Sequence, residues 1–132
     1  MKNLEETRAF FDKDTYATHT TGVVIEAVDD NYSKVSLVLD ERHLNAVGKP
    51  MGAVMGTLVD FSFAVATNSP DHWTVTVSTS LNFLAVPKSD TLYAECTPIR
   101  EGRHTCCYQV RITDSTGLLC HVATVNGMHM VG

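Results

Sequence analysis

The segment NAVGKPMGAVMGTLVDFSFAVATN, residues 45–68, decides the fold. Nearly every residue in its second half is small or apolar, and the period-2 alternation of a half-buried strand is absent. Pro50 suits the approach to a first helical turn, and apolar residues fall on every face, which is typical of a buried helix. The sequence therefore predicts one long buried helix over about residues 52–67, with a single acid, Asp60, near its middle.

Strand patterns flank this segment on both sides. Residues 22–40 contain two alternating runs joined by a turn at residues 29–31, which predicts a β-hairpin. Beyond the helix, alternation predicts four more strands, at residues 73–83, 91–99, 105–113 and 118–127. With a short helix over residues 4–13, this order predicts an α+β fold in which about six antiparallel strands curl around the long helix.

Length and composition restrict the class of protein. The 132 residues suit a single domain, residues 1–132. The formal net charge of -5 argues against non-specific nucleic-acid binding, which needs clustered Lys and Arg. No apolar run has the length of a signal peptide or a membrane span, so we expect a cytoplasmic protein with no membrane partner. The four cysteines have no C-x-x-C spacing, and we expect free, buried thiols.

The lone acid has two possible explanations. Residues three, four and seven apart share a helix face, so Asp60 lies on the least apolar stripe of the predicted helix, with Thr57, Ala64 and Thr67. Burial of an unpaired carboxylate is costly and raises its pKa. Asp60 is therefore either a structural acid, hydrogen-bonded by a threonine or a backbone amide, or a general base or nucleophile in a cleft.

The start of the helix is a second candidate feature. Met51, Gly52 and Ala53 would present free backbone N–H groups at the positive end of the helix dipole. Such an end stabilises a developing oxyanion, and Gly and Ala leave the backbone open to close approach. Small residues at this place also simply permit tight packing, so both interpretations stay open.

These features coincide with the motifs of a known family. Residues 43–69, HLNAVGKPMGAVMGTLVDFSFAVATNS, are similar to the family pattern H-x-N-x-x-G-x-x-H-G-G-x-x-x-x-L-x-D. Residues 8–39 match the opening helix and hairpin of that family, and residues 75–103 match the stretch after its central helix. Nearly end to end, the chain resembles the PaaI-type acyl-CoA thioesterases of the hotdog superfamily. The resemblance implies a hotdog fold, in which a curved antiparallel sheet wraps a long central helix.

The resemblance also implies an assembly and a reaction. It implies a homodimer, usually paired again into a homotetramer, with active sites shared by two chains at the dimer interface. The implied reaction is hydrolysis of an acyl-CoA thioester, with no cofactor apart from the coenzyme A of the substrate. We expect no metal site, because the chain has no H-x-x-x-H or H-E-x-x-H spacing.

Four residues fall on catalytic positions of the family. Asp60 matches the catalytic acid, as general base or nucleophile, and Gly52 matches the glycine whose backbone N–H polarises the thioester carbonyl. Asn45 matches the asparagine that orients the thioester or the attacking water. Thr76 falls near a Ser or Thr that helps to place the water, and we expect it to come from a strand near the partner chain's helix.

One departure from the family concerns the helix start. Where the family has His-Gly-Gly, this chain has Met51-Gly52-Ala53, so the backbone donor is kept and the histidine side chain is lost. Met51 would widen the pocket or make it more apolar. The loss favours an alternative function, a non-catalytic acyl-CoA binding or sensing module. A hotdog dehydratase is discounted, because no histidine lies in residues 51–68.

Further candidates would bind the substrate, with the cations contacting the phosphates of coenzyme A. These candidates are Met51, Ala53, His43, Lys88, Arg100 and Arg103. The three cations lie near turns between late strands, where ordinary solvated charges are an equally good interpretation. His43 would line the cleft, although its position also suits a surface loop.

Overall fold

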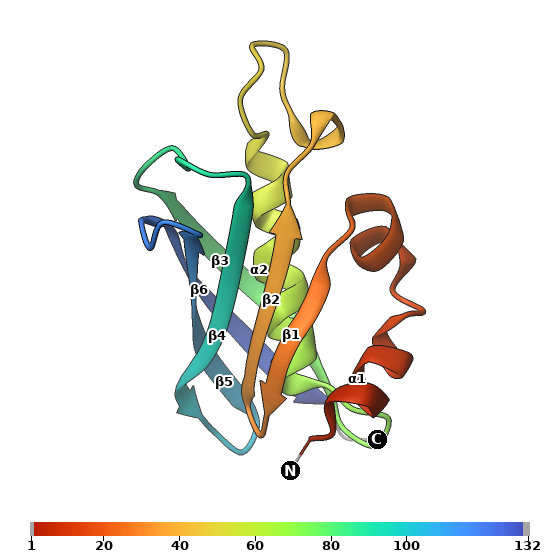
Figure 1. Ribbon diagram of the computed structural model, residues 1–132. Helices are drawn as coiled ribbons and strands as arrows, with labels where there is room; N and C mark the ends of the chain where they lie inside the picture. Colours follow the sequence, from red (N-terminus) through yellow and green to blue (C-terminus); the bar gives the residue numbers. More distant parts are fainter. Residues whose placement is uncertain (1, 131–132) are drawn as a thin grey trace.

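The computed structural model describes residues 2–130 as a curved sheet wrapped around one long helix (Figure 1). Two short helical turns, η1 (Tyr16–Thr21) and η2 (Glu41–His43), accompany the main elements. The helices and strands are α1 (Leu4–Phe11), β1 (Val24–Asp29), β2 (Tyr32–Val38), α2 (Gly52–Thr67), β3 (Trp73–Phe83), β4 (Thr91–Glu101), β5 (Thr105–Asp114) and β6 (Leu119–Met130).

The sheet has six strands in the order β1-β2-β4-β5-β6-β3, and every neighbouring pair is antiparallel. The hairpin β1–β2, the long helix and the four later strands are all where the sequence predicts them. The α+β prediction is therefore confirmed. The N-terminal helix is shorter than expected, because it ends at Phe11 with Asp12 as its C-cap.

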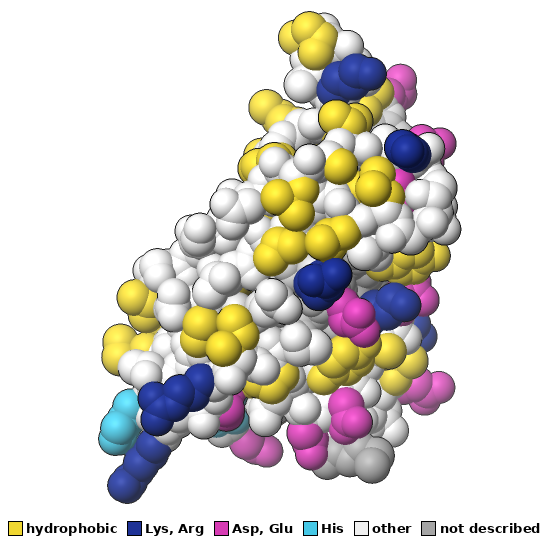
Figure 2. All heavy atoms as spheres, turned by 90° about the vertical axis from the view of Figure 1, so that its left-hand side faces the viewer, with side chains coloured by type: hydrophobic (Ala, Val, Ile, Leu, Met, Phe, Trp, Pro, Cys, Tyr) yellow, Lys and Arg dark blue, Asp and Glu magenta, His cyan; other side chains and the backbone are white. Residues whose placement is uncertain are grey.

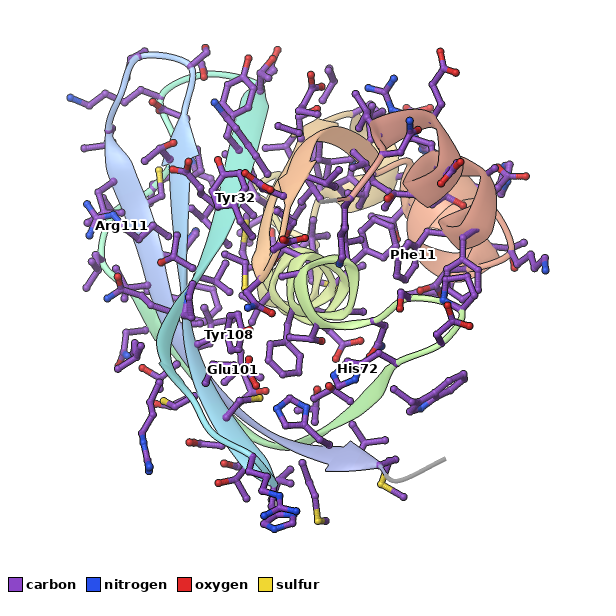
Figure 3. All side chains as sticks on the ribbon, turned by 90° about the horizontal axis from the view of Figure 1, so that it is seen from below. Phe11, Tyr32, His72, Glu101, Tyr108 and Arg111 are labelled. Atoms are coloured by element: carbon purple, nitrogen blue, oxygen red, sulfur yellow. The ribbon has the colours of Figure 1, made fainter. Side chains whose placement is uncertain are left out.

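The core lies between α2 and the concave face of the sheet (Figure 3). Alternate residues of β5, from Cys106 to Asp114, are buried, so one face of this strand is turned to the helix. On α2, Leu58, Val59 and Val65 are fully buried. Complete burial of such a side chain is worth about 1.5–3 kcal/mol, so the apolar run that predicts the helix also holds it against the sheet.

One side of α2 is open, which corrects the expectation of a helix buried on every face. The sheet covers one side, and the α1–η1 segment covers part of the other through an edge-to-face contact of Phe11 with Phe61. Between them Ala53 and Asp60 are exposed. The expected polar stripe does not continue to Thr67, which is buried and donates its hydroxyl to the Phe63 carbonyl at 2.8 Å.

The edge strand β3 has unusual chemistry for a free edge. Within residues 2–130 it pairs only with β6, and its eleven residues, WTVTVSTSLNF, include no charge. Trp73, Val77 and Phe83 are 59%, 62% and 57% exposed. Natural proteins protect long edge strands with charges, prolines or cover, so an uncharged edge with exposed apolar side chains is typical of a strand that pairs with another chain.

The thiols agree with the expectation from cysteine spacing. All four cysteines are free, and Cys96, Cys106 and Cys120 are buried, whereas Cys107 is only half-buried. Among residues 2–130, no helix combines the length and the apolar character needed to cross a membrane.

Candidate active site

Helix α2 begins with an uncapped amino-terminus. Met51 occupies the N-cap position with an extended backbone and makes no side-chain capping bond. The first N–H groups of a helix have no acceptor inside it, so the N–H of Gly52 is available to a ligand at the positive end of the dipole. A Cβ at Gly52 would lie 3.2 Å from Cζ of Phe83. Glycine therefore keeps this N–H accessible beside an exposed ring.

The loop before α2 is organised by Asn45. Its Oδ1 accepts hydrogen bonds from the backbone N–H groups of Val47 at 3.1 Å and Lys49 at 3.0 Å. Its carbonyl accepts from Gly48 N–H at 3.0 Å, which closes the turn. Because Oδ1 is used by the loop, the Nδ2 group is the part of this side chain that could orient a thioester or a water molecule.

Asp60 lies in an open pocket of about 260 Å³ beside the middle of α2. The Thr76 side chain of the same chain lies near its carboxyl group and favours the ionised form. Thr76 lies near the acid of its own chain, and its expected place near the partner chain's helix stays a prediction. The other residues that line the pocket are Asp14, Tyr16, Ala17, Ala53, Gly56, Thr57 and Phe61.

The surroundings of Asp60 raise its pKa above the usual range of an aspartate. Desolvation is the largest cause, and the nearby negative charge of Asp14 adds to it. The Thr76 side chain acts in the opposite direction and lowers the pKa. A carboxyl group held in a pocket at a raised pKa is suited to accept a proton, which favours the catalytic interpretation over the purely structural one.

Gly52 and Asp60 of one chain are too far apart to act on one carbonyl group. They are eight residues apart on α2, which corresponds to about 12 Å of axial rise. Attack on a carbonyl requires reacting atoms about 3–3.5 Å apart. A single chain therefore offers two half-sites, one at the helix start and one at its middle.

The predicted substrate contacts near the helix start divide into two groups. Met51 and Ala53 are exposed beside Gly52, where a ligand would meet them. His43 is buried instead: its Nδ1 accepts from the Asp40 N–H at 2.9 Å, and its Nε2 bonds the Thr21 carbonyl at 2.8 Å. Both ring nitrogens hold the fold together, so neither is left for a substrate.

The three cations predicted to contact phosphates lie at opposite ends of the sheet. Lys88 is in the loop between β3 and β4, where it lines a hollow of about 450 Å³ together with Lys49 and Pro50. Arg100 and Arg103 lie at the far end of β4, whose eleven residues span about 35 Å. Figure 2, which views the molecule from the left-hand side of Figure 1, shows basic side chains near both ends of that face. One chain therefore cannot direct all three at the same phosphate groups.

A second polar cluster lies under the C-terminal end of α2. Tyr108 and His129 both hydrogen-bond the carboxylate of Glu101, and Thr74 bonds His129 Nδ1 at 2.7 Å. Figure 3 shows Tyr108 and Glu101 side by side between the sheet and the helix. Ligand atoms of Glu101, Cys106 and His129 lie within 4.8 Å of one another, an arrangement that could hold a metal ion.

The expectation of no metal remains a prediction at this cluster. Burial is the main cause that raises the pKa of the Cys106 thiol to about 11, so the thiol stays protonated at neutral pH. The carboxylate of Glu101 and the imidazole of His129 already hydrogen-bond each other. Sequence spacing does not reveal the cluster, because its members come from β3, β4, β5 and β6.

Sequence reasoning missed one feature beside the helix start, the buried ring of His121. It comes from β6 and lines a pocket with Pro50, Met55 and Phe83. The alternation of β6 places position 121 on the same face as the core residues Ala123 and Val125. The sequence signal for a special role of His121 is this alternation, since it places a histidine on a strand face where apolar residues are expected.

Comparison with known proteins agrees with this architecture. The thioesterase superfamily profile matches residues 51–121, more than half of the chain. A curated relative, a putative esterase of Archaeoglobus fulgidus, is 28% identical over 95 residues, which are 71% of this chain and 62% of the relative. The chain thus spans less than two thirds of that relative's length.

Solved structures share the fold over nearly the whole chain. The PaaI protein from the phenylacetic acid degradation operon of E. coli superposes with a TM-score of 0.84, 20% identity and 98% coverage of both chains. A hypothetical thioesterase of Streptococcus pneumoniae, crystallised with coenzyme A, gives a TM-score of 0.82, 24% identity, and coverage of 91% of this chain and 96% of that one. The chain belongs to the thioesterase superfamily and has the hotdog fold of the PaaI-type proteins.

Proposed function

We propose that this protein hydrolyses acyl-CoA thioesters to a carboxylic acid and free coenzyme A. The observation that carries the proposal is Asp60, the one charged group on helix α2, which is open to a pocket and has the Thr76 side chain nearby. The uncapped helix start at Gly52 supplies the complementary donor. The superfamily match and the coenzyme A complex of the streptococcal structure support the substrate class.

The active site is completed by a second copy of the chain. The separation of about 12 Å between Gly52 and Asp60 rules out joint action within one chain. The uncharged edge strand β3 is suited to antiparallel pairing with its copy, which would join two sheets into one. Such pairing reverses one chain against the other, so that the start of one α2 lies toward the middle of the other. A homodimer, paired again into a tetramer, is the proposed assembly.

In this shared site, a water molecule held by Asp60 and Thr76 attacks the thioester carbonyl. Asp60 takes one proton of the water as its oxygen bonds the carbonyl carbon, and the carbonyl oxygen gains a negative charge stabilised by the Gly52 N–H of the other chain. When the C–S bond breaks, the sulfur leaves and receives that proton. Direct attack by Asp60 would give an anhydride instead, and the adjacent Thr76 hydroxyl favours the water route.

Coenzyme A is part of the substrate in this scheme, and neither a cofactor nor a metal ion is required. The same reversal of chains that joins the half-sites would bring Arg100 and Arg103 of one chain toward the helix start of the other. Lys88 would reach the substrate from the chain that provides Gly52, because its loop lies beside Pro50. The three cations would then contact the phosphates from two chains.

The test is turnover of a panel of acyl-CoAs, followed through the released thiol, for the wild type and Asp60→Asn. We expect Asp60→Asn to lower kcat about 10²- to 10⁴-fold, the usual contribution of a general base. Asp71→Asn, the same substitution on an exposed turn, is the matched control and should keep wild-type rates.

Two results would count against the proposal. Equal rates for wild type and Asp60→Asn would remove Asp60 from the chemistry. Tight binding of acyl-CoA without turnover of any panel member would support the alternative of a binding or sensing module, which the replacement of the motif histidine by Met51 favours.

A further inference from the structure

The imidazole of His121 is buried without a hydrogen-bond partner. The residue is 3% exposed, and neither Nδ1 nor Nε2 has a partner within residues 2–130. Among residues 2–130, these two nitrogens are the buried side-chain polar atoms that lack a hydrogen-bond partner. Buried polar groups in proteins are nearly always paired, so an unpaired ring facing a pocket indicates a partner that comes from outside the fold.

The ring lines an open, largely apolar pocket of about 240 Å³. Met55 of α2 and Pro50 form one side, and Phe83 with the loop that follows it forms the other. The Phe83 ring meets the His121 ring edge to face, with centroids 4.8 Å apart. Binding pockets for small molecules commonly combine such apolar walls with a few placed polar groups.

The pocket begins beside the candidate oxyanion donor. Phe83, which forms its wall, lies within 3.2 Å of where a Cβ of Gly52 would be. A thioester carbonyl bound at the helix start would thus have its acyl chain beside this pocket, with His121 further in. The pocket is formed by residues of one chain, the same chain that provides Gly52.

We propose that this pocket receives the acyl group, and that His121 selects acyl chains that carry a hydroxyl or carbonyl group at a distance from the thioester. This inference rests on the proposed function, whose substrate class it narrows. Desolvation lowers the pKa of His121, so the ring is neutral and offers one donor and one acceptor. A hydroxyl group can pair with either nitrogen, whereas a plain alkyl chain leaves both unsatisfied.

The test compares hexanoyl-CoA with its derivatives hydroxylated at successive carbons, which are isomers of one another, in the wild type and in His121→Phe. Phenylalanine keeps a planar ring of similar size and removes both nitrogens. The measured quantity is the ratio of kcat/KM for each hydroxylated substrate to that for hexanoyl-CoA, which cancels changes in folded fraction and in the chemical step. His104→Phe, the same substitution on an exposed turn, is the control.

We expect one hydroxylated isomer to be preferred by the wild type about three- to tenfold, the effect of one neutral hydrogen bond. The preference should vanish in His121→Phe and persist in His104→Phe. A wild type that prefers no isomer, or a preference that survives in His121→Phe, would overturn the inference.

The inference can be separated from the proposed function. If the wild type hydrolyses neither these thioesters nor any other member of the acyl-CoA panel, the proposed hydrolysis fails, and the same ratios are measured as dissociation constants by calorimetry. A preference in binding that depends on His121 would then still support the selective pocket. Equal dissociation constants for all isomers would overturn it.

Discussion

Removal of one backbone N–H donor at the start of α2 tests the oxyanion role of Gly52. Gly52→Pro removes the backbone N–H and keeps the helical backbone, because proline is accepted at the first helical position; it also adds ring carbons beside Phe83. The preceding Met51 already has the extended backbone that a following proline requires, with φ −71° and ψ 136°. Loss of one oxyanion donor lowers kcat by about 10²- to 10³-fold, and we expect this loss in thiol release from acyl-CoA.

The control is Gly52→Ala, which keeps the N–H. Its Cβ would lie 3.2 Å from Cζ of Phe83, a half-exposed ring that can move by the few tenths of an ångström required. Gly52→Ala should therefore retain most of the activity that Gly52→Pro loses. Similar losses in both variants would mean that crowding against Phe83, and not the missing donor, explains the effect.

A mixture of two inactive variants extends this prediction to the shared site. In a mixed dimer of Gly52→Pro and Asp60→Asn, one of the two sites combines an intact Gly52 with an intact Asp60. Equal amounts refolded together give mixed dimers in half of the cases, so about a quarter of wild-type activity should return. A mixture no more active than the average of its components would refute a site shared between chains.

The other predictions concern pH and stability. Asp14→Asn should move the acid limb of the rate profile to lower pH, and Thr76→Val should move it to higher pH, because Asp14 raises the pKa of Asp60 and Thr76 lowers it. Asp60→Asn should increase the urea midpoint at pH 7: a carboxyl whose folded pKa is raised favours folding at low pH and loses that contribution as pH rises through this value. Tyr108→Phe should lower the free energy of unfolding by about 1.5–3 kcal/mol, because it removes a buried hydrogen bond to the Glu101 carboxylate; an unchanged urea midpoint would contradict this.

The order of the elements followed from local patterns, whereas α1 ends earlier and β4 and β6 extend further than predicted. Alternation located the strands, and the continuous apolar run located α2 to the residue, because tertiary packing and local periodicity agree there. The pattern also placed Asp60 on a polar stripe with Thr57, and both line the same pocket. The free N–H groups expected at Met51-Gly52-Ala53 and then the family motifs both indicated Gly52, which does lie at an uncapped helix start.

The features that sequence missed depend on contacts between distant strands. Nothing local indicates that Thr76 lies beside Asp60 of its own chain, or that Glu101 meets His129, since strand order brings these residues together. His43 illustrates the opposite error. A histidine in a polar loop suggested a ligand contact. Its Nδ1 instead completes a capping box with Asp40, three residues earlier, and its Nε2 bonds the Thr21 carbonyl.

The most direct measurement is a crystal structure of the Asp60→Asn variant with an acyl-CoA bound. The account predicts a dimer joined along β3, with the thioester oxygen within hydrogen-bond distance of the Gly52 N–H of one chain. The carbonyl carbon should face position 60 of the other chain, with room for one water between them. A thioester bound away from the start of α2 would contradict the account. So would a thioester that contacts Gly52 of one chain without position 60 of the other chain beside it.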